Sequence, residues 1–173
     1  MRALQHTLGS VGIAALIVLG LAAAGWVKLA SAQDAAFGRD VWLRQANCSE
    51  CHGWLANGQP EDPRAPKGAN LRKTTLTADQ IAEVILCGRP GTAMPYFDSR
   101  AYTDARCFGL TKAQMGDQMP DPATIALTKR HADGLALFIL SEFAGKGDTT
   151  FEDCTGLLGA GNARCATLPK KAN

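Results

Sequence analysis

The sequence is poor in the features that identify nucleic-acid-binding and zinc-binding proteins. Its formal net charge is +2, and Arg2 and Lys28, the only charged residues before Asp34, account for that whole excess. The rest of the chain is close to neutral, so no nucleic-acid partner is expected. The chain has 3 histidines, no H-x-x-x-H pattern and a single C-x-x-C pattern, so a structural zinc site would lack two further ligands. No segment alternates apolar and polar residues as a half-buried strand does, which predicts an all-α fold.

The segment from Leu8 to Val27 contains no charged side chain. As a helix rising about 1.5 Å per residue it would extend roughly 30 Å, the thickness of a hydrocarbon core, which predicts a transmembrane anchor. Arg2 and the small residues that end at Ala32 also fit a secretory signal cleaved near Ala32. We favour the anchor, because the apolar run exceeds a signal h-region and Trp26 is placed like an interfacial anchor. Both interpretations export the rest of the chain.

Cys48, Cys51 and His52 form a C-x-x-C-H motif in the stretch "NCSECHGW". On one helical turn, two sulfurs at this spacing can form thioether bonds to one edge of a haem while the adjacent imidazole is turned toward the iron. A thioredoxin-like thiol site would need a βαβ pattern around the motif, and the sequence has none. The motif therefore predicts one haem c, attached through Cys48 and Cys51 and ligated by His52.

Two stretches of the chain resemble a class I (mitochondrial-type) monohaem c-type cytochrome, in its membrane-anchored bacterial form. "GRDVWLRQANCSECHG" resembles the N-terminal helix and haem motif of that family, and "TLTADQIAEVILCGRPGTAMPYF" resembles its next helix and ligand loop. Gly38 and Trp42 stand slightly farther from Cys48 than the matching residues of the family. The resemblance covers roughly residues 35–147 and implies the class I cytochrome c fold.

We expect a membrane anchor or signal peptide at 1–32, the haem domain at 33–147 and a C-terminal extension at 148–173. Asp121 with Pro122 is typical of a helix start and Gly145 of a helix end, which predicts a last helix between them. The resemblance implies that this helix crosses the N-terminal helix near Gly38.

The resemblance implies Met94 as the sixth ligand of the iron, because the family places its axial methionine before a proline in this loop. The preceding segment has a T-x-x-Q capping box that begins at Thr77, so a helix leads into the loop. Met119 also precedes a proline and Met115 is nearby, so both remain alternatives. Any of the three could instead fill a core. Ligation by His131 is a minor alternative.

A proximal histidine usually donates its other ring N–H to a carbonyl or carboxylate. The resemblance implies that "APKGANL" supplies the acceptor, with Pro66 the expected residue, although a plain Pro/Gly turn explains the stretch equally well. Other side chains are expected to line the haem, and each could also be ordinary core: Leu71, Tyr96, Phe97, Trp54 and Ile85.

Four of the 6 cysteines are not used by the haem motif. They lie in or beside two additions to a minimal cytochrome, an inserted loop between Phe97 and Asp121 and a tail after Gly147. Sequence alone permits three pairings. In an oxidising periplasm we favour Cys87 with Cys107 and Cys154 with Cys165, because each pair closes a local loop. The first bridge would then either clamp the segment that carries Met94 or only stabilise the insertion.

With both axial positions filled, the expected chemistry is one-electron transfer rather than catalysis, in a respiratory or photosynthetic chain. The alternative is a fixed haem subunit of a larger periplasmic dehydrogenase or membrane oxidoreductase complex. A haem gas sensor or peroxidase is disfavoured by Met94. We expect the chain at the bacterial inner membrane with its haem domain in the periplasm, or soluble in the periplasm after cleavage near Ala32.

The expected partners are a redox-protein donor and a redox-protein acceptor, most simply membrane oxidoreductases. Arg64, Lys67, Arg72 and Lys73 form a candidate docking patch for acidic partners. A solvated loop accounts for the same charges and is the simpler interpretation.

Overall fold

The computed structural model describes residues 34–171. The predicted anchor at residues 8–27 and the cleavage site near Ala32 lie outside the described residues. Between residues 34 and 171, no helix has both the length and the apolar character needed to span a bilayer.

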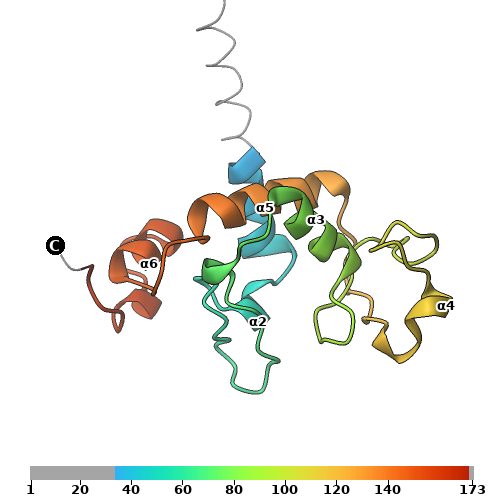
Figure 1. Ribbon diagram of the computed structural model, residues 1–173. Helices are drawn as coiled ribbons and strands as arrows, with labels where there is room; N and C mark the ends of the chain where they lie inside the picture. The colour runs from blue at the N-terminus through green and yellow to red at the C-terminus, as the bar shows by residue number, and fades with distance from the viewer. Residues whose placement is uncertain (1–33, 172–173) are drawn as a thin grey trace, which may run out of the picture. The chain divides into compact units, whose positions relative to one another are not determined.

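The described residues fold into helices joined by long loops, which confirms the all-α prediction for this part of the chain (Figure 1). Residues 34–40 are helical and continue into a π-helical turn. The only β-type pairings within residues 34–171 are isolated bridges. The helices are η1 (Val41–Gln45), α2 (Ser49–His52), η2 (Leu71–Lys73), α3 (Ala78–Cys87), α4 (Lys112–Met115), η3 (Gly116–Gln118), α5 (Lys129–Glu142), α6 (Phe151–Leu158) and η4 (Ala163–Cys165).

The main core forms where the N-terminal helical segment crosses α5, as expected. A Cβ added at Gly38 would lie 1.9 Å from the carbonyl oxygen of Gly134, so only glycine permits this approach. Trp42 is 1% exposed and its ring packs against Phe138 and Phe143 of the C-terminal helical region. The amide of Ala46 bonds the carbonyl of Val41 in the wider π spacing, which takes up one residue more per turn than an α-helix. This wider turn lies between Gly38 and the haem motif.

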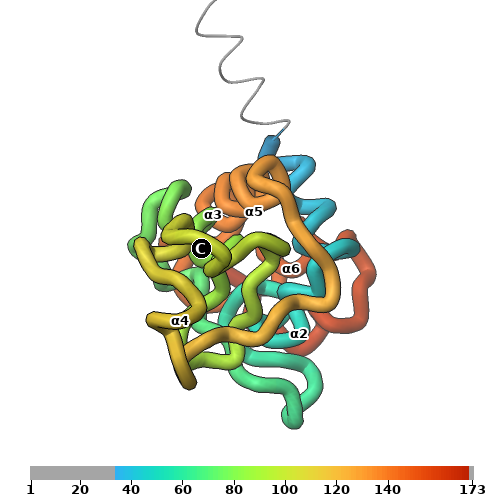
Figure 2. Tube along the Cα trace, turned by 90° about the vertical axis from the view of Figure 1, so that its right-hand side faces the viewer, coloured from blue at the N-terminus to red at the C-terminus, as the bar shows by residue number. Residues whose placement is uncertain are grey.

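α3 lies beside α5 and leads into the loop that carries Met94 (Figure 2). The predicted capping box is present: the Thr77 hydroxyl accepts from the Gln80 amide at 3.3 Å, and the Gln80 side chain accepts from the Thr77 amide at 2.9 Å. Gly88 follows the helix with φ +68°. Its missing Cβ matters, because an added one would lie 2.9 Å from the Met94 carbonyl oxygen.

The last helix of the haem domain begins later than the sequence predicts. α5 starts at Lys129, not at Asp121, and it ends at Glu142. Thr128 accepts from the His131 amide, and the His131 ring accepts from the Thr128 amide at 3.1 Å. Asp121 does not cap the helix; its carbonyl accepts a hydrogen bond from the Tyr96 amide at 3.0 Å. The segment before α5 therefore lies along the ligand loop instead of coiling into the helix.

The two additions pack differently. In Figure 1, α6 of the C-terminal extension and α4 of the insertion lie at opposite ends of the part of the chain that the structure describes. Cys154, Leu157 and Cys165 of the extension are buried in the same core as Trp42. The insertion has a second, smaller core, formed by Cys87, Ala101, Tyr102, Cys107 and Met115.

Candidate haem-binding site

The C-x-x-C-H motif occupies a single helical turn. Cys48 is the N-cap of α2, and Cys51 and His52 end it. Cys48 and Cys51 are the free cysteines of the described residues, and the other four form the predicted disulfides, Cys87 with Cys107 and Cys154 with Cys165. The two sulfurs next to the histidine are therefore available for thioether bonds.

Burial controls the ionisation of both free thiols. It raises the pKa of Cys48 to about 12. It also raises the pKa of Cys51, with a smaller contribution from the Glu50 carboxylate. Reactive or exchange-active cysteines have lowered pKa values, so this pair does not resemble a thiol–disulfide exchange site. Among residues 34–171, no group of three His, Cys, Asp or Glu side chains is arranged to hold a metal ion.

His52 is held with one ring nitrogen free. Its Nδ1 lies 2.8 Å from the carbonyl oxygen of Ala69, an acceptor, so Nδ1 carries the proton and donates. Nε2 is then the unprotonated nitrogen that can bind iron. Burial lowers the pKa of His52, while the bond to Ala69 opposes that effect. The imidazole is therefore neutral at neutral pH, as a metal ligand must be.

The acceptor of this bond is Ala69, and the prediction of Pro66 is wrong. Gly68 forms the turn: its amide donates to the Cys51 carbonyl at 2.8 Å, which brings the next carbonyl under the ring. A Cβ added at Gly68 would lie 2.7 Å from His52 Nδ1, so only glycine fits beneath the imidazole. Pro66 is exposed. In the sequence, Gly68 rather than Pro66 marks the place where the backbone can closely approach the imidazole.

The loop after the motif is tied back to the same region. The Leu71 amide donates to the Ala56 carbonyl at 2.8 Å, and the Gly58 amide donates to the His52 carbonyl at 2.8 Å. Trp42 Nε1 donates to the carbonyl of Trp54 at 3.3 Å. These bonds hold the peptide that carries Ala69 against α2, so the orientation of the imidazole is built into the backbone.

Met94 differs from the other two candidate methionines. Met115 is buried in the second core and Met119 packs against it, so both fill space there. Met94 is half-buried and belongs to neither core. Its amide donates to the Thr92 hydroxyl at 3.2 Å, and its carbonyl accepts from the Arg89 amide at 3.2 Å, which gives the loop a defined shape. Of the three methionines, Met94 is therefore the one that fills neither core.

Most of the side chains expected to line the haem are divided between the two cores. Leu71 and Phe97 pack against the main core and Ile85 lies within it, whereas Tyr96 packs against the second core. All but Ile85 are only partly buried, so they keep surface that a porphyrin could cover. Their contact with haem stays a prediction.

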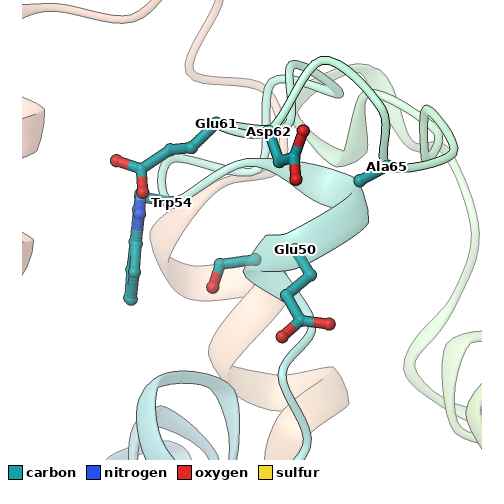
Figure 3. Close-up of a pocket in the computed structure, with 6 residues that line it drawn as sticks. Glu50, Trp54, Glu61, Asp62 and Ala65 are labelled. Atoms are coloured by element: carbon teal, nitrogen blue, oxygen red, sulfur yellow. The ribbon is translucent and has the colours of Figure 1, made fainter.

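A polar pocket of about 380 Å³ lies beside α2 (Figure 3). The Trp54 ring is covered by the Arg164 guanidinium at 5.0 Å, and Arg164 also binds the Glu61 carboxylate. That hydrogen bond is the main reason that the pKa of Glu61 is lowered. The acidic lining is unsuited to an apolar macrocycle, so we do not assign this pocket to haem. It is lined by Ser49, Glu50, Trp54, Glu61, Asp62 and Ala65.

Two other candidate residues have structural roles. The Nδ1 of His131 accepts from the Thr128 cap of α5, which leaves no support for bis-histidine ligation. Arg72 is 2% exposed and binds Asp153, so the prediction that it contributes to a docking patch is wrong. Arg64, Lys67 and Lys73 are exposed.

A free cysteine pair on one turn, a neutral imidazole with Nε2 unprotonated, and a methionine loop after the next helix are the features expected of a c-type cytochrome domain. Residues 33–112 match the family described as cytochrome C oxidase, cbb3-type, subunit III, and this match supports a class I c-type cytochrome. Such a domain implies haem c and redox-protein partners, and it is that of an electron-transfer protein rather than a catalytic enzyme. No curated protein and no solved structure matches the chain.

Proposed function

We propose that this protein carries single electrons through one haem c attached to Cys48 and Cys51, with His52 and Met94 as the axial ligands. The observation that carries the proposal is the His52 imidazole, which is fixed by the Ala69 carbonyl with Nε2 left to bind iron. When bound, the group supplies an iron that alternates between the ferric and ferrous states. The chain's own part is to orient the imidazole, to supply the opposing thioether and to exclude water and substrates from the iron.

The Met94 thioether separates electron transfer from ligand-binding functions. An iron held only by histidine has an open face, whereas a methionine fills that face and raises the reduction potential. Met94 lies after α3 in a loop whose shape is set by Gly88 and by backbone hydrogen bonds, so the thioether is presented by a defined backbone. This favours a carrier over a haem gas sensor or peroxidase.

The test replaces each methionine by leucine, which keeps the volume but cannot ligate iron. Ferric Met94→Leu should lose the sulfur-to-iron charge-transfer band at the red end of the spectrum. Met119→Leu, the matched control, should keep it. The ligand assignment is wrong if Met94→Leu keeps the band, and loss of the band in Met119→Leu alone would identify that residue instead. A blank pyridine haemochrome assay on the wild type would show that the protein carries no haem c and would refute the proposal.

We also propose that the protein works at the periplasmic face of a bacterial inner membrane, anchored through residues 8–27. The two disulfides of the described residues support an oxidising compartment. Intact-mass measurement of protein purified from membranes tests the anchor, because a mature chain that starts at Gln33 would show cleavage and leave a soluble periplasmic protein.

A fixed haem subunit of a larger membrane oxidoreductase is the second candidate. The description of the matching family, which names an oxidase subunit, favours it. Extraction in a mild detergent followed by affinity purification separates the two functions. A stoichiometric partner that persists through washing indicates a subunit, and a chain that elutes alone while exchanging electrons with a membrane fraction indicates a mobile carrier.

A further inference from the structure

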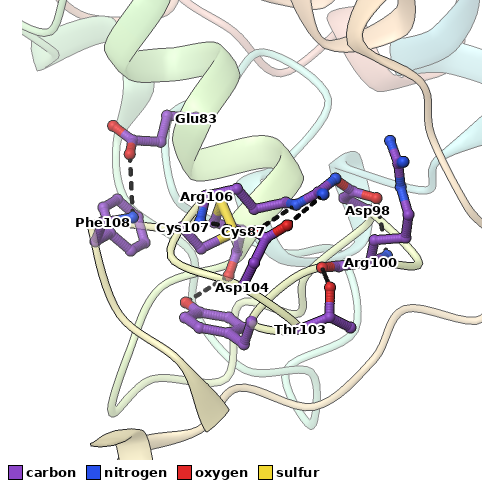
Figure 4. Close-up of a disulfide and its surroundings, with 10 residues drawn as sticks. Glu83, Cys87, Asp98, Arg100, Thr103, Asp104, Arg106, Cys107 and Phe108 are labelled. Carbon is purple, nitrogen blue, oxygen red and sulfur yellow. Dashed lines mark hydrogen bonds and ion pairs between the residues drawn. A yellow bond between two sulfur atoms is a disulfide. The ribbon is translucent and has the colours of Figure 1, made fainter.

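The proposed ligand loop runs from Gly88 to Pro95, and the residue on each side of it is bonded to the insertion or to the residue that directly follows the insertion. Cys87 precedes the loop and Tyr96 follows it. Cys87 is bonded to Cys107 of the insertion through a disulfide (Figure 4). The Tyr96 amide donates to the Asp121 carbonyl at 3.0 Å. The start of the loop is therefore fixed to the insertion, and its end is fixed to Asp121, the residue that directly follows the insertion.

Tyr102 contacts both of these flanking residues at once. It is 2% exposed, and its hydroxyl donates to the Cys87 carbonyl at 2.8 Å. Its ring meets the Tyr96 ring edge-on, with the centroids 6.1 Å apart and the planes at 75°. Burial raises the pKa of Tyr102, so its hydroxyl stays a donor at neutral pH. A single side chain thus bridges the start and the end of the Met94 loop.

The backbone of Tyr102 is also constrained. Its φ is +60°, a conformation that bulky residues adopt only when surrounding contacts require it. The Lys112 amide donates to its carbonyl at 3.0 Å, and the side chain lies in the second core with Cys87, Cys107 and Met115. The insertion therefore holds this tyrosine in one orientation, aimed at the ligand loop.

The centre of the loop has weaker support. The Gly91 amide donates to the Gln118 carbonyl at 2.9 Å, again a contact with the insertion. Gly91 and Thr92 are exposed. Without anchored ends, such a short and exposed loop would sample open conformations, because few buried contacts oppose its opening.

We infer that Tyr102 is a positioning residue for the sixth ligand: through Cys87 and Tyr96 it keeps the Met94 loop closed and the far face of the iron covered. This inference rests on the proposed ligation by Met94. Loss of the Tyr102 contacts raises the fraction of molecules in which the thioether has left the iron, without unfolding the domain. The insertion then serves to suppress access of other ligands to the haem.

The test compares Tyr102→Phe, which loses only the hydroxyl, with Tyr102→Leu, which also loses the edge contact. Thr103→Val is the matched control, because the Thr103 hydroxyl donates to a carbonyl at the same 2.8 Å but within the insertion itself, to Arg100. The readout is imidazole binding to the ferric holoprotein, which requires that the thioether has left the iron. Far-UV circular dichroism at the same temperature confirms that each variant is folded.

Loss of one buried hydrogen bond should raise the apparent imidazole affinity of Tyr102→Phe about fivefold. The apparent imidazole affinity of Tyr102→Leu should rise further, to about tenfold or more above that of the wild type. The sulfur-to-iron band of this variant should also be weaker. Thr103→Val should stay within about twofold of the wild type. Wild-type affinity in both Tyr102 variants overturns the inference, as does an equal rise in Thr103→Val, which would indicate general loosening of the insertion.

The Met94→Leu variant distinguishes a failure of the ligand assignment from a failure of the positioning role. If it loses the sulfur-to-iron band while the Tyr102 variants bind imidazole like the wild type, only the positioning role fails. If it keeps the band, the ligand assignment fails and the positioning role fails with it.

Discussion

Arg72 is the buried charge that joins the haem domain to its C-terminal extension, and its removal should destabilise the protein strongly. Its side chain is 1% exposed, and the guanidinium donates to Asp153 Oδ2 at 2.6 Å and to the Gly147 carbonyl at 2.6 Å. It also donates to the carbonyls of Lys146 at 3.2 Å and Asp148 at 3.1 Å. One side chain thus donates hydrogen bonds to three successive backbone carbonyls in the turn between α5 and α6.

The cost of Arg72→Ala can be bounded from these contacts. Breaking a buried ion pair costs about 3–5 kcal/mol, because the remaining charge is left unpaired. The Asp153 side chain is 26% exposed, so water recovers part of that cost. Unpaired carbonyls and a side-chain-sized void add to it. We expect a loss of about 3 kcal/mol, which corresponds to roughly 9 °C in the midpoint of thermal unfolding.

The assay is urea unfolding of the holoprotein, followed by far-UV circular dichroism and tryptophan fluorescence. Lys73→Ala is the control, because Lys73 is the adjacent residue in η2 and is exposed. It should change the free energy of unfolding by less than about 0.5 kcal/mol. A change below about 1 kcal/mol for Arg72→Ala would refute the view that this residue fixes the extension.

The remaining predictions concern close contacts and one carboxylate. Gly38→Ala places a Cβ 1.9 Å from a backbone oxygen of α5, which cannot move independently, so a loss of about 3 kcal/mol or more is expected in the same urea assay. Gly68→Ala places a Cβ 2.7 Å from His52 Nδ1 and should displace the imidazole, seen as a larger high-spin fraction in the ferric absorption spectrum. An unchanged spectrum would contradict the packing of Gly68 on the ring. The Arg164 hydrogen bond lowers the pKa of Glu61 below its ordinary value of 4.5, so the stability that it supplies is present above that pH and is lost as the pH falls further. Melting temperatures between about pH 7 and about pH 3 should therefore fall less steeply for Glu61→Gln, and parallel curves would show that the pair does not matter.

The sequence predicted those parts of the site that depend on local spacing. The haem-motif turn follows from Cys48, Cys51 and His52, and the cap of α3 follows from Thr77 and Gln80, because both are contacts over one turn. The disulfides agree with the preference for local loops, although the sequence itself left three pairings open. The membrane anchor lies outside the described residues and stays a prediction.

The errors have a common physical origin in contacts between residues far apart in the sequence. The sequence places the start of α5 too early, because the Asp121 carbonyl accepts from the ligand loop and no local pattern reveals that bond. The sequence predicts Arg72 at the surface, because its partner lies 81 residues away. The sequence does not indicate Ala69, because a carbonyl acceptor carries no side-chain signature and only the adjacent Gly68 marks the close approach.

The extension also bears on how well the haem motif is shielded from water. Cys154, Leu157 and Cys165 belong to the core against which Cys48 packs. A chain truncated after Gly147 would lack these three side chains, so water would reach apolar surface beside the attachment turn. The tail that its own disulfide closes is therefore part of the wall of the haem domain.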